Sequence, residues 1–151
     1  YNPDVAEAAD LLKTLMDSLG LGRRYWSSSV DDTEYISEKL DRTSLIVVAG
    51  GDGTILRTVR VTGPFEVPIV GINMGRVGFM TELKVEEAVE KLPAYLDGNM
   101  RVEKRMMLEA SVTSDSEPLS RMKLQALNEV VVGRGSVARL QRVPVLTQDH
   151  R

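Results

Sequence analysis

The chain has 151 residues, enough for one domain of ordinary size or for one domain and part of another. Its formal net charge is −3, so it has no basic excess to neutralise phosphates, and we expect no nucleic-acid partner. It has no cysteine, which excludes a disulfide framework and a thiolate metal site. No apolar run approaches the roughly 20 residues that span a bilayer, and no signal-peptide pattern opens the chain. We therefore expect a cytoplasmic protein without a membrane part.

Helical and strand patterns alternate over the first part of the chain. Apolar side chains recur at three- and four-residue spacing over residues 3–19, which predicts an amphipathic helix. Residues 24–26 have the composition of a short strand, and a loop over 27–32 leads into a second helix that runs through Leu40. The apolar run at 45–49 is too short for a helix and is typical of a strand covered on both faces of a parallel sheet.

The same order then repeats. A helix is predicted from Thr54 to about Val61, and residues 68–72 are a second buried-strand candidate. Residues 85–96 have a helical pattern, with Pro93 as an awkward interior residue. Alternating strands and helices are the signature of an α/β layer, so the sequence predicts an α/β domain with a parallel sheet over residues 1–99.

After this point the pattern changes to strands without helices. Apolar and polar side chains alternate over residues 106–113, which is the period of a half-buried strand. Residues 124–132 and 140–146 are two more strand candidates. We therefore predict that residues 100–151 are the start of an all-β, β-sandwich-like domain, which is incomplete because three strands make only a thin sheet.

The most informative stretch is Gly50-Gly51-Asp52-Gly53-Thr54, which joins a buried strand to a helix. Glycines let the backbone approach a ligand closely, and the N-terminus of the helix offers unpaired N–H groups to phosphate oxygens. A carboxylate repels phosphate, so Asp52 needs another purpose, such as taking a proton from an attacking hydroxyl or helping to hold Mg²⁺. The alternative is a Gly-Asp-Gly turn that binds no ligand.

Three segments carry a resemblance to a known family. The GGDGT sequence at residues 50–54 resembles the phosphate-donor loop shared by NAD kinases, diacylglycerol and sphingosine kinases, and phosphofructokinases. The GINMGRVGFM sequence at 71–80 resembles the GIN-G-LGF segment of NAD kinases, and ALNEVVV at 126–132 resembles their second motif, an Asn-Glu or Asn-Asp pair on a strand. The resemblance to the NAD kinase family extends from about residue 45 to residue 143.

The resemblance implies a role for several residues of the α/β part. Asp52 would be the proton acceptor, within a phosphate loop formed by Gly50, Gly51, Gly53 and Thr54. Gly53 would also contact the nucleotide through its backbone. Arg57 would lie near the phosphates, and the alternative is a solvated helix residue. Phe79 would pack against the base of NAD, and the alternative is a core aromatic residue.

The β part adds the remaining candidates. Asn128 and Glu129 would contact the hydroxyls and base of NAD, and the alternative is an exposed pair on an edge strand. Arg139 would lie on the bound nucleotide. No residue is assigned as a ligand in a dedicated metal site, although Mg²⁺ is expected with ATP.

The resemblance therefore implies an NAD kinase, which transfers the γ-phosphate of ATP to the 2′-hydroxyl of the adenosine ribose of NAD and makes NADP. It also implies a homo-oligomer, either a dimer or a tetramer. The family continues with a further Asp-Gly segment and a Thr-Pro-Thr-Gly-Ser-Thr-Ala-Tyr-like loop beyond the last motif found here. We therefore expect no turnover by these 151 residues alone. The alternatives are a lipid kinase with the same GGDGT loop and a non-catalytic nucleotide-binding fragment.

Overall fold

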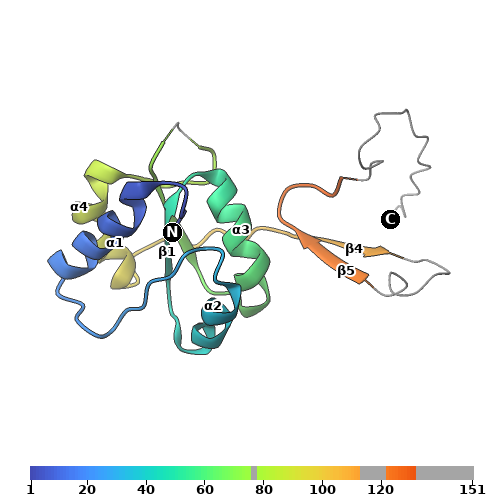
Figure 1. Ribbon diagram of the computed structural model, residues 1–151, viewed down its shortest axis with the longest axis horizontal. Helices are drawn as coiled ribbons and strands as arrows, with labels where there is room; N and C mark the ends of the chain where they lie inside the picture. The colour runs from blue at the N-terminus through green and yellow to red at the C-terminus, as the bar shows by residue number, and fades with distance from the viewer. Residues whose placement is uncertain (76–77, 113–121, 132–151) are drawn as a thin grey trace. The chain divides into compact units, whose positions relative to one another are not determined.

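The computed structural model describes residues 1–75, 78–112 and 122–131 (Figure 1). The chain divides into two compact units, Tyr1–Met106 and Met107–Arg151, which are described separately below. The two domains predicted from sequence, 1–99 and 100–151, remain a prediction.

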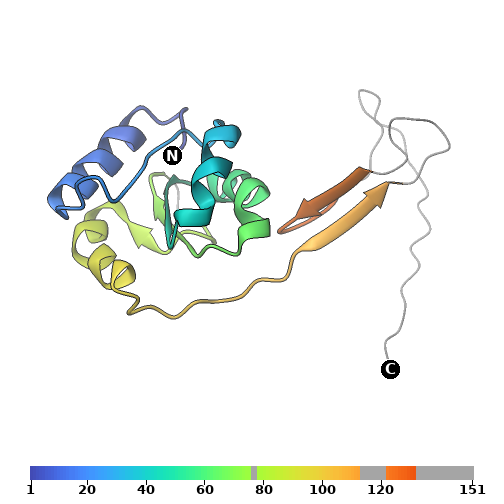
Figure 2. The ribbon, with the colours of Figure 1, turned by 90° about the horizontal axis from the view of Figure 1, so that it is seen from below.

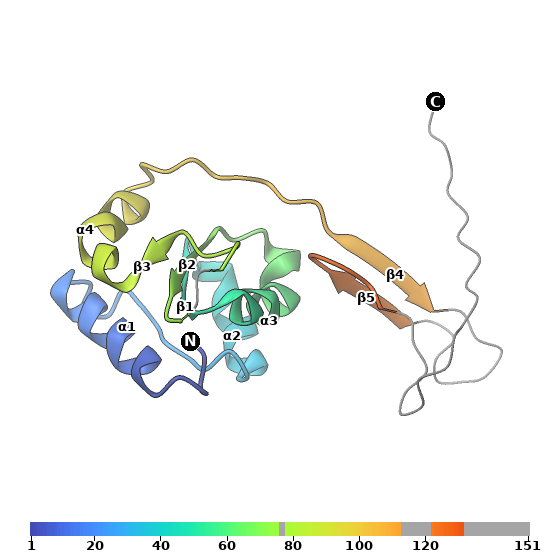
Figure 3. The same ribbon diagram turned by 90° about the horizontal axis from the view of Figure 1, so that it is seen from above.

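The first unit contains a parallel sheet of three strands in the order β1-β2-β3 (Figure 3). The strands are β1 (Ile46–Gly50), β2 (Ile69–Asn73) and β3 (Leu83–Lys84). The two predicted strands are confirmed as β1 and β2, and they pair in register from one end to the other. The short β3 was not predicted, because two residues are too few to show a period. The α/β fold class with a parallel sheet is confirmed.

Two helices cover each face of this sheet, as Figures 1 and 3 show. Helices α1 (Ala6–Ser18) and α4 (Val85–Leu96) pack on one face, and α2 (Thr33–Lys39) and α3 (Asp52–Thr62) pack on the other. Two short 3₁₀ turns, η1 (Leu40–Arg42) and η2 (Gly63–Phe65), follow α2 and α3. Within the described part of the chain, no helix has the length and apolar character needed to cross a membrane.

The sheet divides the core into two clusters because its strands are buried on both sides. Ile46 and Val48 of β1 pack with α2 and α3, whereas Ala49 packs with α1 and α4. Side chains alternate between the two faces of a strand, so a strand covered on both faces must be apolar at every position. This requirement accounts for the unbroken apolar run at residues 45–49.

Local details differ from the sequence-based expectation at several points. Residues 24–26 form no strand, because they pair with no neighbouring strand in the sheet. Helix α3 begins at Asp52 rather than Thr54, because the carbonyl of Gly51 accepts hydrogen bonds from the amides of Thr54 (2.9 Å) and Ile55 (3.2 Å). Helix α4 continues past Pro93 to Leu96. Proline has no amide hydrogen, but Pro93 lies close to the end of the helix, where the loss of one backbone hydrogen bond has little effect.

In the second unit the described residues form a two-stranded antiparallel sheet (Figure 2). Strand β4 (Leu108–Val112) pairs with β5 (Met122–Ala126), and the Nζ of Lys123 lies 2.9 Å from Oε1 of Glu109. Two strands cannot enclose a core by themselves, and the side chains of Leu108 and Leu124 are accordingly exposed. The predicted strand at 140–146 lies outside the described residues, and a β-sandwich stays a prediction.

Two leucines of α4 provide a test of this packing. Leu92 is 0% exposed between α1 and the sheet, whereas Leu96 is 39% exposed. We expect Leu92→Ala to lower the free energy of unfolding by about 2–5 kcal/mol, because it leaves a cavity in the core. Leu96→Ala makes the same change of side chain in the same helix and should cost about 1 kcal/mol or less. Urea unfolding followed by circular dichroism measures both, and equal losses would contradict the assigned core.

Candidate functional site

The candidate site lies where β1 and β2 end. The two strands are parallel, so their carboxyl ends meet at one edge of the sheet, the edge at which α/β proteins bind ligands. The amide of Met74 donates to the carbonyl of Gly50 (3.3 Å), which ties the segment after β2 to the end of β1. Asn73 then turns the chain, because its Oδ1 accepts a hydrogen bond from the amide of Gly75 (3.1 Å).

Helix α3 presents its N-terminus at this edge. Gly51 is the N-cap residue, so Asp52 and Gly53 are the first two residues of the helix. Among the described residues no hydrogen-bond partner is recorded for the amides of Asp52 and Gly53. Unpaired amides and the positive end of the helix dipole attract anions, including phosphate. A carboxylate in the first turn is also favourable to the helix itself.

The carboxylate of Asp52 is the point at which the two predicted motifs meet. Its Oδ2 accepts a hydrogen bond from the amide of Phe79 (2.9 Å), and its Oδ1 accepts one from the amide of Met80 (3.0 Å). We call this pair of hydrogen bonds the Asp52 clamp. An ionised carboxylate has about four acceptor sites, so each oxygen can still accept a proton or another hydrogen bond.

Gly78 makes the Asp52 clamp possible. A Cβ atom built on Gly78 would lie 2.2 Å from Oδ1 and 2.8 Å from Cγ of Asp52, closer than any real contact. Any other residue at this position would push the carboxylate away from the two amides. The sequence pattern contained this glycine within the GINMGRVGFM segment, but nothing in the pattern related it to Asp52.

The glycines of the GGDGT loop serve two different purposes. A Cβ atom on Gly50 would lie 2.4 Å from Oγ1 of the buried Thr54, so close packing in the loop requires glycine there. A Cβ atom on Gly51 or Gly53 would meet no atom within 4 Å, and neither residue has a positive φ. The fold of the described residues therefore does not require glycine at these two positions, which leaves their backbone open to a ligand.

Arg57, on the second turn of α3, is held by two carboxylates. Its guanidinium donates a hydrogen bond to Oδ1 of Asp31 and lies 4.0 Å from Oδ2 of Asp4. A guanidinium is charged at physiological pH, and the hydrogen bond to Asp31 raises its pKa further. The side chain of Arg57 is 35% exposed, and a position near phosphates stays a prediction. The partner Asp31 was not anticipated from the sequence.

Phe79 is 97% exposed, so the alternative of a core aromatic residue is wrong. Its backbone is fixed by the Asp52 clamp while its ring faces solvent. An exposed aromatic ring beside a carboxylate is available to stack on a base or another planar group.

The pair Asn128 and Glu129 lies in the second unit, after the end of β5. The prediction that these residues lie on a strand is wrong. Strand β5 ends at Ala126, which pairs with Leu108, the first residue of β4. Residues 127–131, the described residues beyond Ala126, therefore continue no pairing with β4. Both side chains are exposed, and their contact with a nucleotide stays a prediction. Arg139 lies outside the described residues.

Acidic residues do not gather into a dedicated cation site in the described ranges, where no group of three or more His, Asp or Glu side chains could hold a metal ion. A divalent cation at this site would depend on ligands supplied by a nucleotide, as Mg²⁺ commonly does.

Comparison with known proteins identifies the family. Residues 7–100 match the model of the ATP-NAD kinase N-terminal domain, and this range includes both the GGDGT loop and the segment that forms the Asp52 clamp. The chain belongs to the ATP-NAD kinase family.

Individual relatives extend this similarity beyond residue 100. The chain is 40% identical over 144 residues to the NAD kinase of Dehalococcoides mccartyi, which covers 95% of the chain and 50% of the relative. It is 42% identical over 114 residues to the NAD kinase of Heliobacterium modesticaldum, covering 76% of the chain and 40% of the relative. The chain thus spans about half the length of the curated relatives it matches, or less.

The Asp52 clamp can be tested at Gly78. We expect Gly78→Ala to displace the carboxylate and to speed amide hydrogen exchange at Phe79 and Met80 about tenfold, because a hydrogen bond contributes about 1 kcal/mol and one to a charged group more. Gly75→Ala is the matched control, since a Cβ atom there meets nothing within 4 Å. Exchange measured by NMR would contradict the clamp if both amides kept their protection in Gly78→Ala.

Proposed function

We propose that the protein containing this chain is an NAD kinase, which transfers the γ-phosphate of ATP to the 2′-hydroxyl of the adenosine ribose of NAD. Membership of the ATP-NAD kinase family supports this proposal. The observation that carries it is the position of Asp52, at the N-terminus of α3 and hydrogen-bonded to the Phe79–Met80 segment. The same side chain thus stands at a helix N-terminus, which is suited to phosphate, and is bonded to the backbone of an exposed aromatic residue.

In this proposal Asp52 is the general base. Its carboxylate takes the proton of the 2′-hydroxyl, and the oxygen attacks the γ-phosphorus of ATP. The bond from the γ-phosphorus to the bridging oxygen breaks, and ADP leaves with that electron pair. A general base of this kind contributes about 10²–10⁴-fold to a rate. The clamp would hold the carboxylate in one orientation throughout, because both oxygens are tied to backbone amides.

The donor phosphates would lie against the open backbone of the GGDGT loop. The amides of Asp52 and Gly53 would donate to phosphate oxygens, and the absence of side chains at Gly51 and Gly53 would let those oxygens approach. Arg57 would add positive charge from the second turn of the same helix.

The acceptor nucleotide would lie on the other side of Asp52. Phe79 would stack on the base of NAD, since its ring is free and its backbone is held by Asp52. Asn128, Glu129 and Arg139 stay predicted contacts of the acceptor nucleotide, as the family resemblance implies.

Mg²⁺ fits this site only as a partner of ATP. It is usually bound by one or two carboxylates together with substrate phosphates, and Asp52 has an unused acceptor site on each oxygen. Bound in this way, it would neutralise charge on the β- and γ-phosphates. A cytoplasmic location and assembly into a dimer or tetramer are further parts of the proposal.

The lipid-kinase alternative is not favoured, because the relatives are named NAD kinases and the family match covers the GINMGRVGFM segment as well as the GGDGT loop.

Replacement of Asp52 tests the catalytic proposal in the full-length protein. We expect Asp52→Asn to lower kcat for NAD by about 10²–10⁴-fold, because an amide cannot accept the proton, with little change in the affinity for NAD. Asp10→Asn, an equal change on the exposed side of α1, should leave kcat unaltered. A steady-state assay of NADP formation measures both variants, and a kcat that survives Asp52→Asn would refute the role of base. Activity of the wild-type protein on a diacylglycerol or a sphingoid base, and none on NAD, would refute the substrate.

Gly51 and Gly53 supply a second test, in which substitution should raise the stability of the helix and lower the affinity for ATP. We expect Gly53→Ala to raise the stability of α3 by about 0.5–1 kcal/mol, because alanine is the better helix former. The same change places a methyl group where phosphate oxygens would lie, so ATP affinity should fall by about tenfold or more, corresponding to an overpacking cost of about 1–3 kcal/mol. Calorimetric titration with ATP and urea unfolding of the full-length protein measure the two effects. Unchanged ATP affinity in both Gly51→Ala and Gly53→Ala would contradict the proposed phosphate site.

A further inference from the structure

The chain that carries Phe79 returns to the sheet at Glu82. It leaves the sheet after β2 and comes back beside it at β3, whose first residue, Leu83, pairs with Ile72 (Figure 3). Glu82 is therefore the last residue before β3, and it lies two residues after Met80. Two residues of extended chain span at most about 7 Å, so a contact at Glu82 limits how far Met80 can move.

Glu82 is bonded to Gly71 of β2 in both directions. The amide of Glu82 donates to the carbonyl of Gly71 (3.0 Å), and Oε2 of Glu82 accepts from the amide of Gly71 (2.7 Å). The second bond is short, as hydrogen bonds to an ionised carboxylate commonly are. One residue thus binds both the amide and the carbonyl of a single position in β2.

The carboxylate of Glu82 acts here in place of a strand. The pairing of β2 with β3 begins at Ile72, one residue after Gly71. The amide of Gly71, which is buried, lies before that pairing and uses the side chain of Glu82 as its acceptor. Buried backbone amides normally have a partner, so loss of this carboxylate would disturb both β2 and the chain that returns to it.

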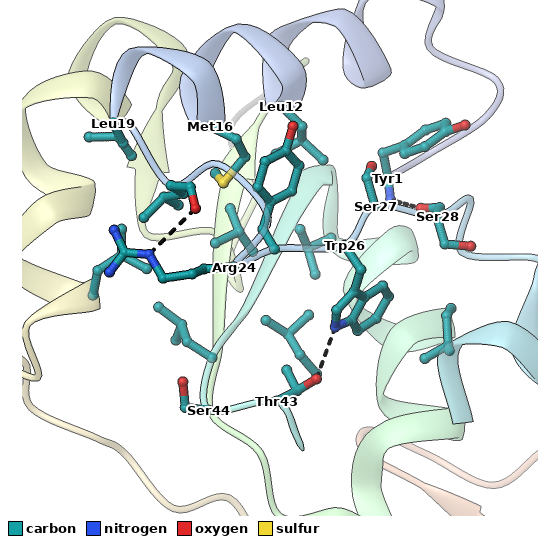
Figure 4. Close-up of a pocket in the computed structure, with 18 of the residues that line it drawn as sticks. Tyr1, Leu12, Met16, Leu19, Arg24, Trp26, Ser27, Ser28, Thr43 and Ser44 are labelled. Atoms are coloured by element: carbon teal, nitrogen blue, oxygen red, sulfur yellow. Dashed lines mark hydrogen bonds between the residues drawn. The ribbon is translucent and has the colours of Figure 1, made fainter. Parts of the chain in front are cut away.

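Close packing around Gly71 leaves the returning chain little room. A Cβ atom on Gly71 would lie 2.7 Å from Cδ1 of Ile55 and 3.1 Å from Cα of Thr81, so the backbone of Thr81 passes against β2. A cavity of about 510 Å³ borders β1 in the same unit (Figure 4), but neither Gly71 nor Glu82 lines it. The contact therefore lies in a closely packed part of the unit, where the returning chain can move away from Gly71 but not across it.

Two carboxylates thus hold the backbone on either side of Phe79 and Met80. Asp52 accepts from the amides of these two residues, and Glu82 joins the chain that follows them to β2. Asp52 belongs to α3, so the two anchors bind the segment to different elements. The ring of Phe79 is 97% exposed, and its position therefore depends on these backbone contacts.

We propose that Glu82 is a positioning residue for the acceptor nucleotide. Its carboxylate, bonded to Gly71, holds the chain around Phe79 against β2 and so fixes where the ring meets the base of NAD. Glu82 acts through Phe79 rather than by contact with the substrate. This inference rests on the proposed function, since it takes NAD as the acceptor.

Substitution of Glu82 in the full-length protein tests this role. Glu82→Gln keeps an oxygen that can accept from the amide of Gly71, whereas Glu82→Ala removes the acceptor. We expect Glu82→Ala to raise the KM for NAD about three- to tenfold, the change that the loss of one hydrogen bond produces, and to leave the KM for ATP unaltered. Glu82→Gln should restore most of the affinity for NAD. Glu90→Ala, the same change at an exposed glutamate of α4, is the matched control and should behave as the wild type.

Hydrogen exchange separates this inference from the proposed function, because it needs no substrate. In the Glu82→Ala variant, exchange should become about tenfold faster at Gly71 and about threefold faster at Phe79 and Met80, as mass spectrometry of the full-length protein can measure. Faster exchange at Gly71 alone, or an unchanged KM for NAD, would overturn the positioning role.

Equal effects of Glu82→Gln and Glu82→Ala would also overturn the proposal, because the charge of Glu82 rather than its hydrogen bond would then matter. If the exchange rates change as expected but the wild-type protein forms no NADP, the proposed function is refuted and the support of Phe79 by Glu82 stands.

Discussion

The hydrogen bonds that Asp52 accepts from Phe79 and Met80 determine the geometry of the candidate site. A further link between the GGDGT loop and the segment after β2 is the hydrogen bond from the amide of Met74 to the carbonyl of Gly50. A carboxylate is well suited to this task, because it accepts one amide on each oxygen and also complements the dipole of the helix that it begins. One side chain thereby orders the loop and remains able to accept a proton.

The glycine pattern reflects two separate requirements. Gly50 and Gly78 are fixed by contacts within the protein, since a Cβ atom would collide with Thr54 in the first case and with Asp52 in the second. Gly51 and Gly53 have no such contact. A motif that looks uniform in the sequence therefore combines residues required by packing with residues at which the described part of the fold has room for a side chain.

The sequence predicted those parts of the fold that depend on local patterns. The apolar run at 45–49 and the spacing in residues 3–19 correctly indicated a buried strand and an amphipathic helix. The Asp52 clamp could not be predicted in this way, because its partners are 27 and 28 residues away and donate through their backbone, which no residue type reveals. The end of β5 was mispredicted for a related reason. A strand ends where its pairing partner ends, and the pairing with β4 ends at Ala126, although the residues that follow have the composition of a strand.

Charge connects α3 to the segments that precede two other helices. Arg57 of α3 pairs with Asp31, which lies just before α2, and with Asp4, which lies just before α1. One guanidinium thereby joins the helix that begins at Asp52 to the segments that lead into α1 and α2.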